Sequence, residues 1–214
     1  MIRVPSMLLA STTLLATIAC SQNEEAKQAD DGPSHPLIEA ARSQVGVTTH
    51  YDSGYAALDY PGGDIPMERG VCTDVIIRAM RKGYRMDLQK LVHVDMKANF
   101  SKDPKIWGLK GTDRNIDHRR VPNLQTFFKR KGYALKVSEK AENYQAGDLV
   151  TCIVPPHLPH IMLVSNRKDQ DGVPFVIHNI GSGAKEEDSL FRFKLTGHYR
   201  IPLPATKAGM PKSE

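Results

Sequence analysis

The chain has 214 residues, of which 40% are hydrophobic and 25% are charged, with a formal net charge of +5. This composition is that of a globular protein with enough apolar residues for one domain with a real core. The basic residues are spread along the chain without an arginine-rich or aromatic-interleaved module, which argues against nucleic acid as a partner.

Residues 1–19 predict an export signal, because their nearly uncharged stretch is shorter than the ~20 apolar residues of a membrane-spanning helix. The signal ends in a motif that resembles the lipoprotein box of bacteria, Leu15-Ala16-Thr17-Ile18-Ala19-Cys20. We expect lipidation of Cys20, with ordinary signal-peptidase cleavage as the alternative because Thr17 replaces the usual leucine. Ser21 after the cysteine favours a periplasmic protein anchored to the outer membrane.

The next residues predict a tether and then a folded domain. Residues 20–36 have no apolar periodicity and end in turn formers, so we expect a solvated linker. A single domain is expected over residues 37–204, and residues 205–214 are expected to form a flexible tail. The domain begins with a short helix from Leu37 that Gly46 ends.

A glycine-bounded turn then leads into a helix-periodic stretch that begins at Cys72 and is expected to end at Gly83. The unpaired N–H groups and the dipole of a helix start favour a thiolate, which is a nucleophile. The simplest alternative is that Cys72 is a small apolar residue packed in the helix. In the preceding loop, residues 48–67, Tyr51 and Tyr55 line a substrate groove or simply pack the loop.

Two further helices are predicted, over residues 86–100 and 124–132, and the pattern changes after them. Lys168–Gly172 has the sequence of a hairpin turn. Short β-rich segments separated by turn residues follow one another at Ala134–Val137, Asp148–Val154, His160–Val164, Phe175–His178, Leu190–Phe193 and His198–Ile201. This order predicts an α+β fold with N-terminal helices packed on a C-terminal antiparallel sheet of about five to six strands.

A cysteine hydrolase needs a thiolate, an imidazole base and a third group that orients the imidazole. Cys72, His160 and His178 occur in that order, each histidine at one end of a predicted strand. This order and two strand sequences resemble the NlpC-type cell-wall peptidases, a papain-like group: Gln145-Ala146-Gly147-Asp148-Leu149-Val150 and Pro159-His160-Ile161-Met162-Leu163-Val164. The resemblance implies that His160 is the base, with His157 as its rival. It places His178 in the third position, ahead of Asn179 on the other strand face.

A closer resemblance connects the chain to a bacterial family catalogued as a domain of unknown function and regarded as NlpC-like. It covers nearly the whole mature domain and implies no established substrate. Around the cysteine, the chain departs from the Asp-Cys-Ser-Gly of NlpC-type enzymes. Three motifs carry the closer resemblance: Gly70-Val71-Cys72-Thr73-Asp74-Val75, Asn115-Ile116-Asp117-His118-Arg119-Arg120-Val121-Pro122-Asn123-Leu124 and Val176-Ile177-His178-Asn179-Ile180-Gly181.

Charged residues in these motifs are further candidates for substrate binding. Asp74 hydrogen-bonds a substrate amine or caps the start of the cysteine helix. Arg119 and Arg120 clamp a substrate carboxylate, or pair with Asp117 and Asp113 to hold the structure.

We therefore expect a cofactor-free, cysteine-dependent amidase or peptidase of the bacterial envelope. It would hydrolyse peptide bonds of peptidoglycan, or another peptide substrate, through Cys72, His160, His178 and a thioester. A zinc site at His157, His160 and His178 is the second hypothesis, but it lacks the helical spacing and the Glu of metallopeptidases, so no metal is expected. The third is a noncatalytic envelope protein that binds wall peptides or a partner. A disulfide between Cys72 and Cys152, common in exported proteins, would favour it.

Overall fold

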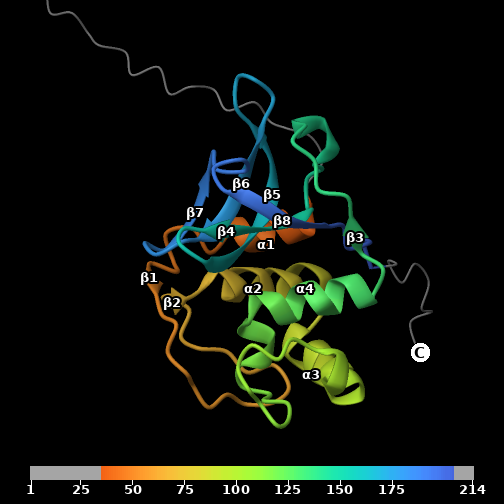
Figure 1. The fold of residues 1–214 in the computed structure, drawn as a ribbon. Coiled ribbons are helices and arrows are strands. Elements are labelled where there is room, and N and C mark those ends of the chain that lie inside the picture. Colours follow the sequence, from red (N-terminus) through yellow and green to blue (C-terminus); the bar gives the residue numbers. More distant parts are fainter. Residues whose placement is uncertain (1–34, 205–214) are drawn as a thin grey trace, which may run out of the picture.

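A six-stranded antiparallel sheet with helices packed on one face forms the described part of the chain, residues 35–204 of a computed structural model (Figure 1). The strand order is β3-β8-β4-β5-β6-β7, and every neighbouring pair is antiparallel. The expected α+β class and the expected sheet are therefore confirmed. The predicted signal peptide, Cys20, the tether up to residue 34 and the tail from residue 205 lie outside the described residues.

The α-helices precede the main sheet in the chain. The α-helices are α1 (Pro36–Arg42), α2 (Cys72–Tyr84), α3 (Leu88–Asn99) and α4 (Val121–Arg130). Three 3-10 helices connect them or follow them, η1 (Phe100–Lys102), η2 (Asp117–Arg119) and η3 (Ala141–Asn143). A two-residue parallel pair, β1 (His50–Tyr51) and β2 (Arg69–Gly70), joins the two ends of the loop before α2. The main sheet consists of β3 (Ala134–Leu135), β4 (Leu149–Val154), β5 (Leu158–Lys168), β6 (Pro174–Asn179), β7 (Ala184–Glu187) and β8 (Lys194–Tyr199).

Helix α2 begins at Cys72, as the sequence predicts, but it does not end at Gly83. Gly83 lies inside the helix, where a Cβ atom would stand 2.5 Å from the carbonyl oxygen of Pro36. The glycine is therefore needed for the close approach of α1 to α2. The helix ends at Tyr84, and Arg85 follows in the left-handed conformation with φ 54°.

One predicted strand is wrong. Residues 190–193 form a turn, and the strand on this side of the sheet is β7, Ala184–Glu187. The segment resembles a strand because it contains the apolar residue Leu190, which lies in the loop and is fully buried against the sheet. The sequence pattern does not predict β7 because three of its four residues are charged, which is a common composition for a strand at the edge of a sheet.

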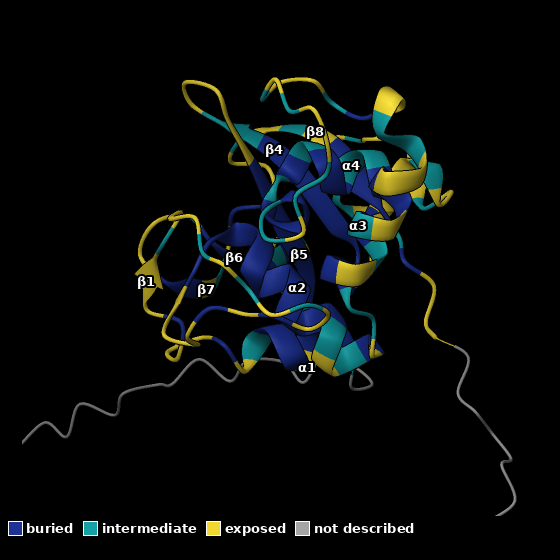
Figure 2. Ribbon diagram, turned by 90° about the horizontal axis from the view of Figure 1, so that it is seen from below, coloured by how far each residue is buried: buried dark blue, intermediate teal, exposed yellow. Residues whose placement is uncertain are grey.

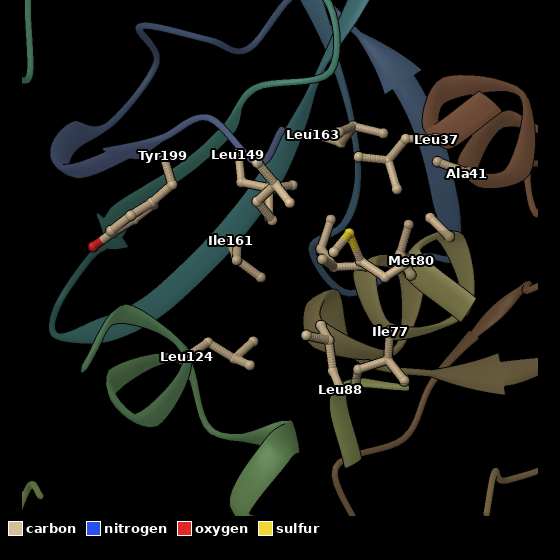
Figure 3. Packing of buried hydrophobic residues seen from close by; sticks show 14 of the residues in the cluster. Leu37, Ala41, Ile77, Met80, Leu88, Leu124, Leu149, Ile161, Leu163 and Tyr199 are labelled. Carbon is tan, nitrogen blue, oxygen red and sulfur yellow. The ribbon is translucent and has the colours of Figure 1, made fainter. Parts of the chain in front are cut away.

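The main core lies between the sheet and the helices, and a second, smaller apolar cluster covers the other face of the sheet. In Figure 3, Leu149, Ile161 and Leu163 point from the sheet toward Met80 of α2 and Leu37 of α1. Alternate residues of β5 belong to the second cluster. Figure 2 shows α2, β5 and β6 as the buried centre of the molecule, surrounded by exposed loops.

Among residues 35–204, no helix combines the length and the apolar character that crossing a bilayer requires.

Candidate active site

Two hydrogen bonds fix the residues just before Cys72, one from within α2 and one from the sheet. The Asp74 carboxylate accepts a 2.7 Å bond from the N–H of Val71 and so caps the helix from inside its first turn. The side-chain amide of Asn179, at the end of β6, donates a 2.9 Å bond to the carbonyl of Gly70. Asn179 thus lies on the helix-facing side of the sheet and fixes the turn that presents Cys72.

The Cys72 thiol lies against the peptide group that joins His160 to Ile161. The N–H of Ile161 interacts with the sulfur, together with the N–H groups of Cys72 and Thr73. This N–H is available because of the sheet register. Val164 donates to Asp148 of the β4 side, so by alternation Ile161 directs its N–H toward β6, and the β5–β6 register stops at Leu163 before reaching it.

The thiol is not a thiolate in this closed site, contrary to the expectation from its helix position. Cys72 is 4% exposed, and burial raises its pKa to about 11, with a smaller contribution from the Asp74 carboxylate. The surrounding N–H groups act in the opposite direction but are outweighed. Burial, with a smaller contribution from the neighbouring His178, lowers the pKa of His160 to about 3. Thiol and imidazole are therefore both neutral at pH 7.

The two histidines and a glutamate form a hydrogen-bonded chain. Nε2 of His160 lies 2.8 Å from Nδ1 of His178, and Nε2 of His178 lies 3.1 Å from Oε1 of Glu187. Both rings are buried, whereas the Glu187 side chain is 31% exposed. Burial lowers the pKa of His178, while the Glu187 carboxylate partly offsets this effect.

This chain of contacts assigns the tautomer of each ring. An ionised carboxylate only accepts hydrogen bonds, so Nε2 of His178 carries a proton and its Nδ1 is an acceptor. His160 must then donate from Nε2, which leaves the lone pair on its Nδ1. That nitrogen makes no hydrogen bond among the described residues and keeps some solvent access. Glu187 therefore selects the tautomer of His160 with a free Nδ1.

Alternation along β5 places the His160 ring on the same face of the sheet as its cross-strand neighbour Cys152, opposite to Ile161 and the helices. The structure therefore does not bring the predicted base beside the Cys72 thiol.

A cavity of about 450 Å³ opens beside Cys72. Tyr51 lies in its wall, and burial raises the pKa of this phenol to about 12, with smaller contributions from Cys72 and Asp74. Tyr55 does not line the cavity; its hydroxyl donates to Asp113. The lining residues are Tyr51, Ser53, Val71, Cys72, Ile106, Trp107, Ile116, Arg119, Arg120, Val121, Pro122, His157 and Pro159.

Asp74 and Arg119 form a buried ion pair with each other. The Arg119 guanidinium donates to both carboxylate oxygens of Asp74 at 2.9 Å, and further to the carbonyls of Asp52 and Gly54. Both side chains are at most 5% exposed. The partner of Arg119 is thus neither Asp113 nor Asp117, and this buried pair ties α2 to the loop that follows β1.

The two described cysteines are both free. Cys72 belongs to the cluster between sheet and helices, and Cys152 belongs to the cluster on the other face of the sheet. Burial raises the pKa of Cys152 to about 12. Within residues 35–204, no three His, Cys, Asp or Glu side chains are grouped as metal ligands would be. His157 lines the cavity while His160 and His178 bond to each other.

Sequence reasoning missed two residues of this site. Glu187 follows no motif and lies on a charged edge strand, so only the sheet register brings it to His178. Trp107 lies in an irregular segment between η1 and η2, and its side chain packs under Arg120 in the cavity wall. The available signal was that it is the single tryptophan of the chain, placed outside every predicted element.

Comparisons with known proteins agree with the second resemblance seen in the sequence. Residues 38–201 match the family described as "Domain of unknown function (DUF1287)". The chain is 53% identical over 164 residues to a protein of Escherichia coli (strain K12) that carries the name "Uncharacterized protein YijF". The alignment covers 77% of this chain and 80% of that protein. No solved structure matches significantly.

Proposed function

Because this chain belongs to the DUF1287 family, whose description names no activity, we propose a function from its site: a cysteine-dependent amidase or peptidase of the NlpC type. One observation carries the proposal. Cys72 lies at the start of α2, with backbone N–H groups around its sulfur, in the wall of a cavity that His157 also lines. A cysteine and a histidine in one cavity can act as a pair in which the imidazole removes the thiol proton as the sulfur attacks.

The reaction proceeds in two displacements. The ring of His157 takes the thiol proton, and the sulfur of Cys72 adds to the carbonyl carbon of an amide. The N–H groups of Cys72, Thr73 and Ile161 surround the sulfur and stabilise the negative charge that develops on it. The proton on His157 passes to the leaving amine as the C–N bond breaks. Water then loses a proton to His157 and attacks the thioester, which releases the carboxylic acid, and His157 returns the proton to the sulfur.

His160 and His178 have a positioning role. The hydrogen bonds from Glu187 through His178 hold His160 on the other face of the sheet, and the next residue, Ile161, presents the N–H that contacts the Cys72 sulfur.

The substrate we propose is the peptide part of peptidoglycan, and the site of action is the bacterial envelope. The sequence supports this through the export signal, the lipoprotein box at Cys20 and the NlpC-type strand sequences. An exported enzyme anchored by lipid would meet wall peptides and would have no contact with nucleic acid.

A direct test compares wild type with Cys72→Ala in hydrolysis of purified peptidoglycan, measured as newly exposed amino groups. Cys152→Ala is the matched control, because it removes the other free cysteine on the far face of the sheet. We expect Cys72→Ala to abolish release and Cys152→Ala to retain it. Release by folded Cys72→Ala protein would contradict the proposal.

The noncatalytic alternative is favoured by a different observation. No hydrogen bond joins the Cys72 sulfur to a histidine within residues 35–204, and the pKa of the thiol is raised to about 11. A protein that binds wall peptides without cleaving them would sediment with peptidoglycan equally well as wild type and as Cys72→Ala, and neither form would release amino groups.

A further inference from the structure

Arg119 and Arg120 both line the cavity beside Cys72, but their donors are not equally occupied. The guanidinium of Arg119 donates hydrogen bonds to the Asp74 carboxylate and to two backbone carbonyls. Among the described residues, Arg120 makes one side-chain hydrogen bond, 3.3 Å long, from Nη1 to Asp117. A guanidinium has five N–H donors, so most of those on Arg120 have no acceptor in this part of the chain.

The position of Arg120 is nevertheless fixed. Its guanidinium carbon lies 4.2 Å from the centroid of the Trp107 ring, and its side chain is 17% exposed. The stacking orients the planar fork and shields one of its faces from water. Asp117 is itself 1% exposed and accepts a backbone bond from Asp113, so it does not move out to neutralise the cavity.

The wall of the cavity carries cations but no carboxylate. None of the thirteen described residues that line it is an Asp or Glu, and Asp74 and Asp117, the partners of Arg119 and Arg120, lie behind the wall. A cation with vacant, preoriented donors in such a cavity favours a carboxylate, which a guanidinium binds through two parallel hydrogen bonds.

We propose that Arg120, held by Trp107, binds a free carboxylate of the substrate, so that the site selects acidic peptides over their neutral amides. This proposal rests on the proposed function, and it names the class of peptide that the hydrolase accepts. A compact cavity of about 450 Å³ is ~10 Å across, and an extended chain advances ~3.3–3.6 Å per residue. The carboxylate therefore lies within about three residues of the bond that Cys72 attacks.

Binding can be measured without turnover, because Trp107 is the single tryptophan of the chain and reports on this cavity. The protein is the Cys72→Ala form of the full chain. The probes are acetyl-alanyl-alanine with a free carboxylate and the same dipeptide as a carboxamide, titrated against the fluorescence of Trp107. We expect the acid to bind at least about tenfold more tightly than the amide.

Arg120→Met should reduce the ratio of the two affinities to about one, and Arg120→Lys, which keeps the charge but loses the fork, should give an intermediate ratio. Arg114→Met is the control, since Arg114 is exposed and does not line the cavity. If the Cys72→Ala protein, in which Arg120 is unchanged, binds the acid and the amide with equal affinity, the proposal is overturned. This comparison does not depend on whether Arg120→Met folds. An acid preference that survives in folded Arg120→Met protein would overturn it too. If instead the acid preference depends on Arg120 but wild type releases nothing from peptidoglycan, the proposed hydrolase function fails while the carboxylate site stands.

Discussion

The buried, neutral state of His160 makes the stability of the protein depend on pH in a way that one substitution should remove. Its pKa is about 3 in the folded protein and 6.5 in an exposed chain. The unfolded chain therefore binds one more proton between these values, so stability is complete above pH 6.5 and is lost as the pH falls. The loss is about 1.4 kcal/mol per pH unit, or about 1.3 kcal/mol between pH 7.0 and 5.5.

The measurement is urea unfolding of wild type and His160→Gln at pH 7.0 and 5.5. The variant should lose about 1.3 kcal/mol less than wild type over this interval. His118→Gln is a positive control, because burial also lowers the pKa of His118, in η2, to about 4. Identical losses for wild type and His160→Gln, with a reduced loss for His118→Gln, would show that His160 is not neutral and buried as described.

Three further substitutions test the contacts around the site. Glu187→Gln should cost about 1 kcal/mol in urea unfolding, since a hydrogen bond to a charged group is worth ~1.5–3 kcal/mol and this carboxylate is partly exposed; an unchanged stability would mean that Glu187 does not bond to His178. Asp74→Asn should cost about 3 kcal/mol in urea unfolding because it leaves the buried guanidinium of Arg119 uncompensated, and a cost below about 1 kcal/mol would contradict the pairing. Gly83→Ala should destabilise by roughly 1–3 kcal/mol through the clash with Pro36, whereas a gain would mean that the helices are not in close contact.

Much of the fold follows from local sequence signals. A glycine turn before an apolar, helix-periodic run was enough to place Cys72 at the start of α2, and alternation with turn residues was enough for β4, β5 and β6. These signals are local because a helix start or a hairpin depends on residues a few positions apart.

The parts that sequence reasoning missed depend on contacts between distant residues. The carboxylate of Glu187 reaches His178 only through the register of β6 and β7. A glycine at position 83 predicts the end of a helix from sequence alone. Its role in packing depends on α1, which lies against it in the folded chain. The position of Cys72 at a helix start predicts a lowered pKa, and this prediction is wrong. Burial under the sheet outweighs the effect of the helix start and raises the pKa of the thiol.

The most direct test of the central claim is to look for the thioester on Cys72. Wild-type protein is mixed with soluble peptides released from peptidoglycan, quenched in acid within seconds and analysed by mass spectrometry of the intact chain and of its fragments. We predict an added acyl group on the fragment that contains Cys72, removable by hydroxylamine and absent from Cys72→Ala. Amide hydrolysis that proceeds while this fragment stays unmodified, and that persists in Cys72→Ala, would contradict the account.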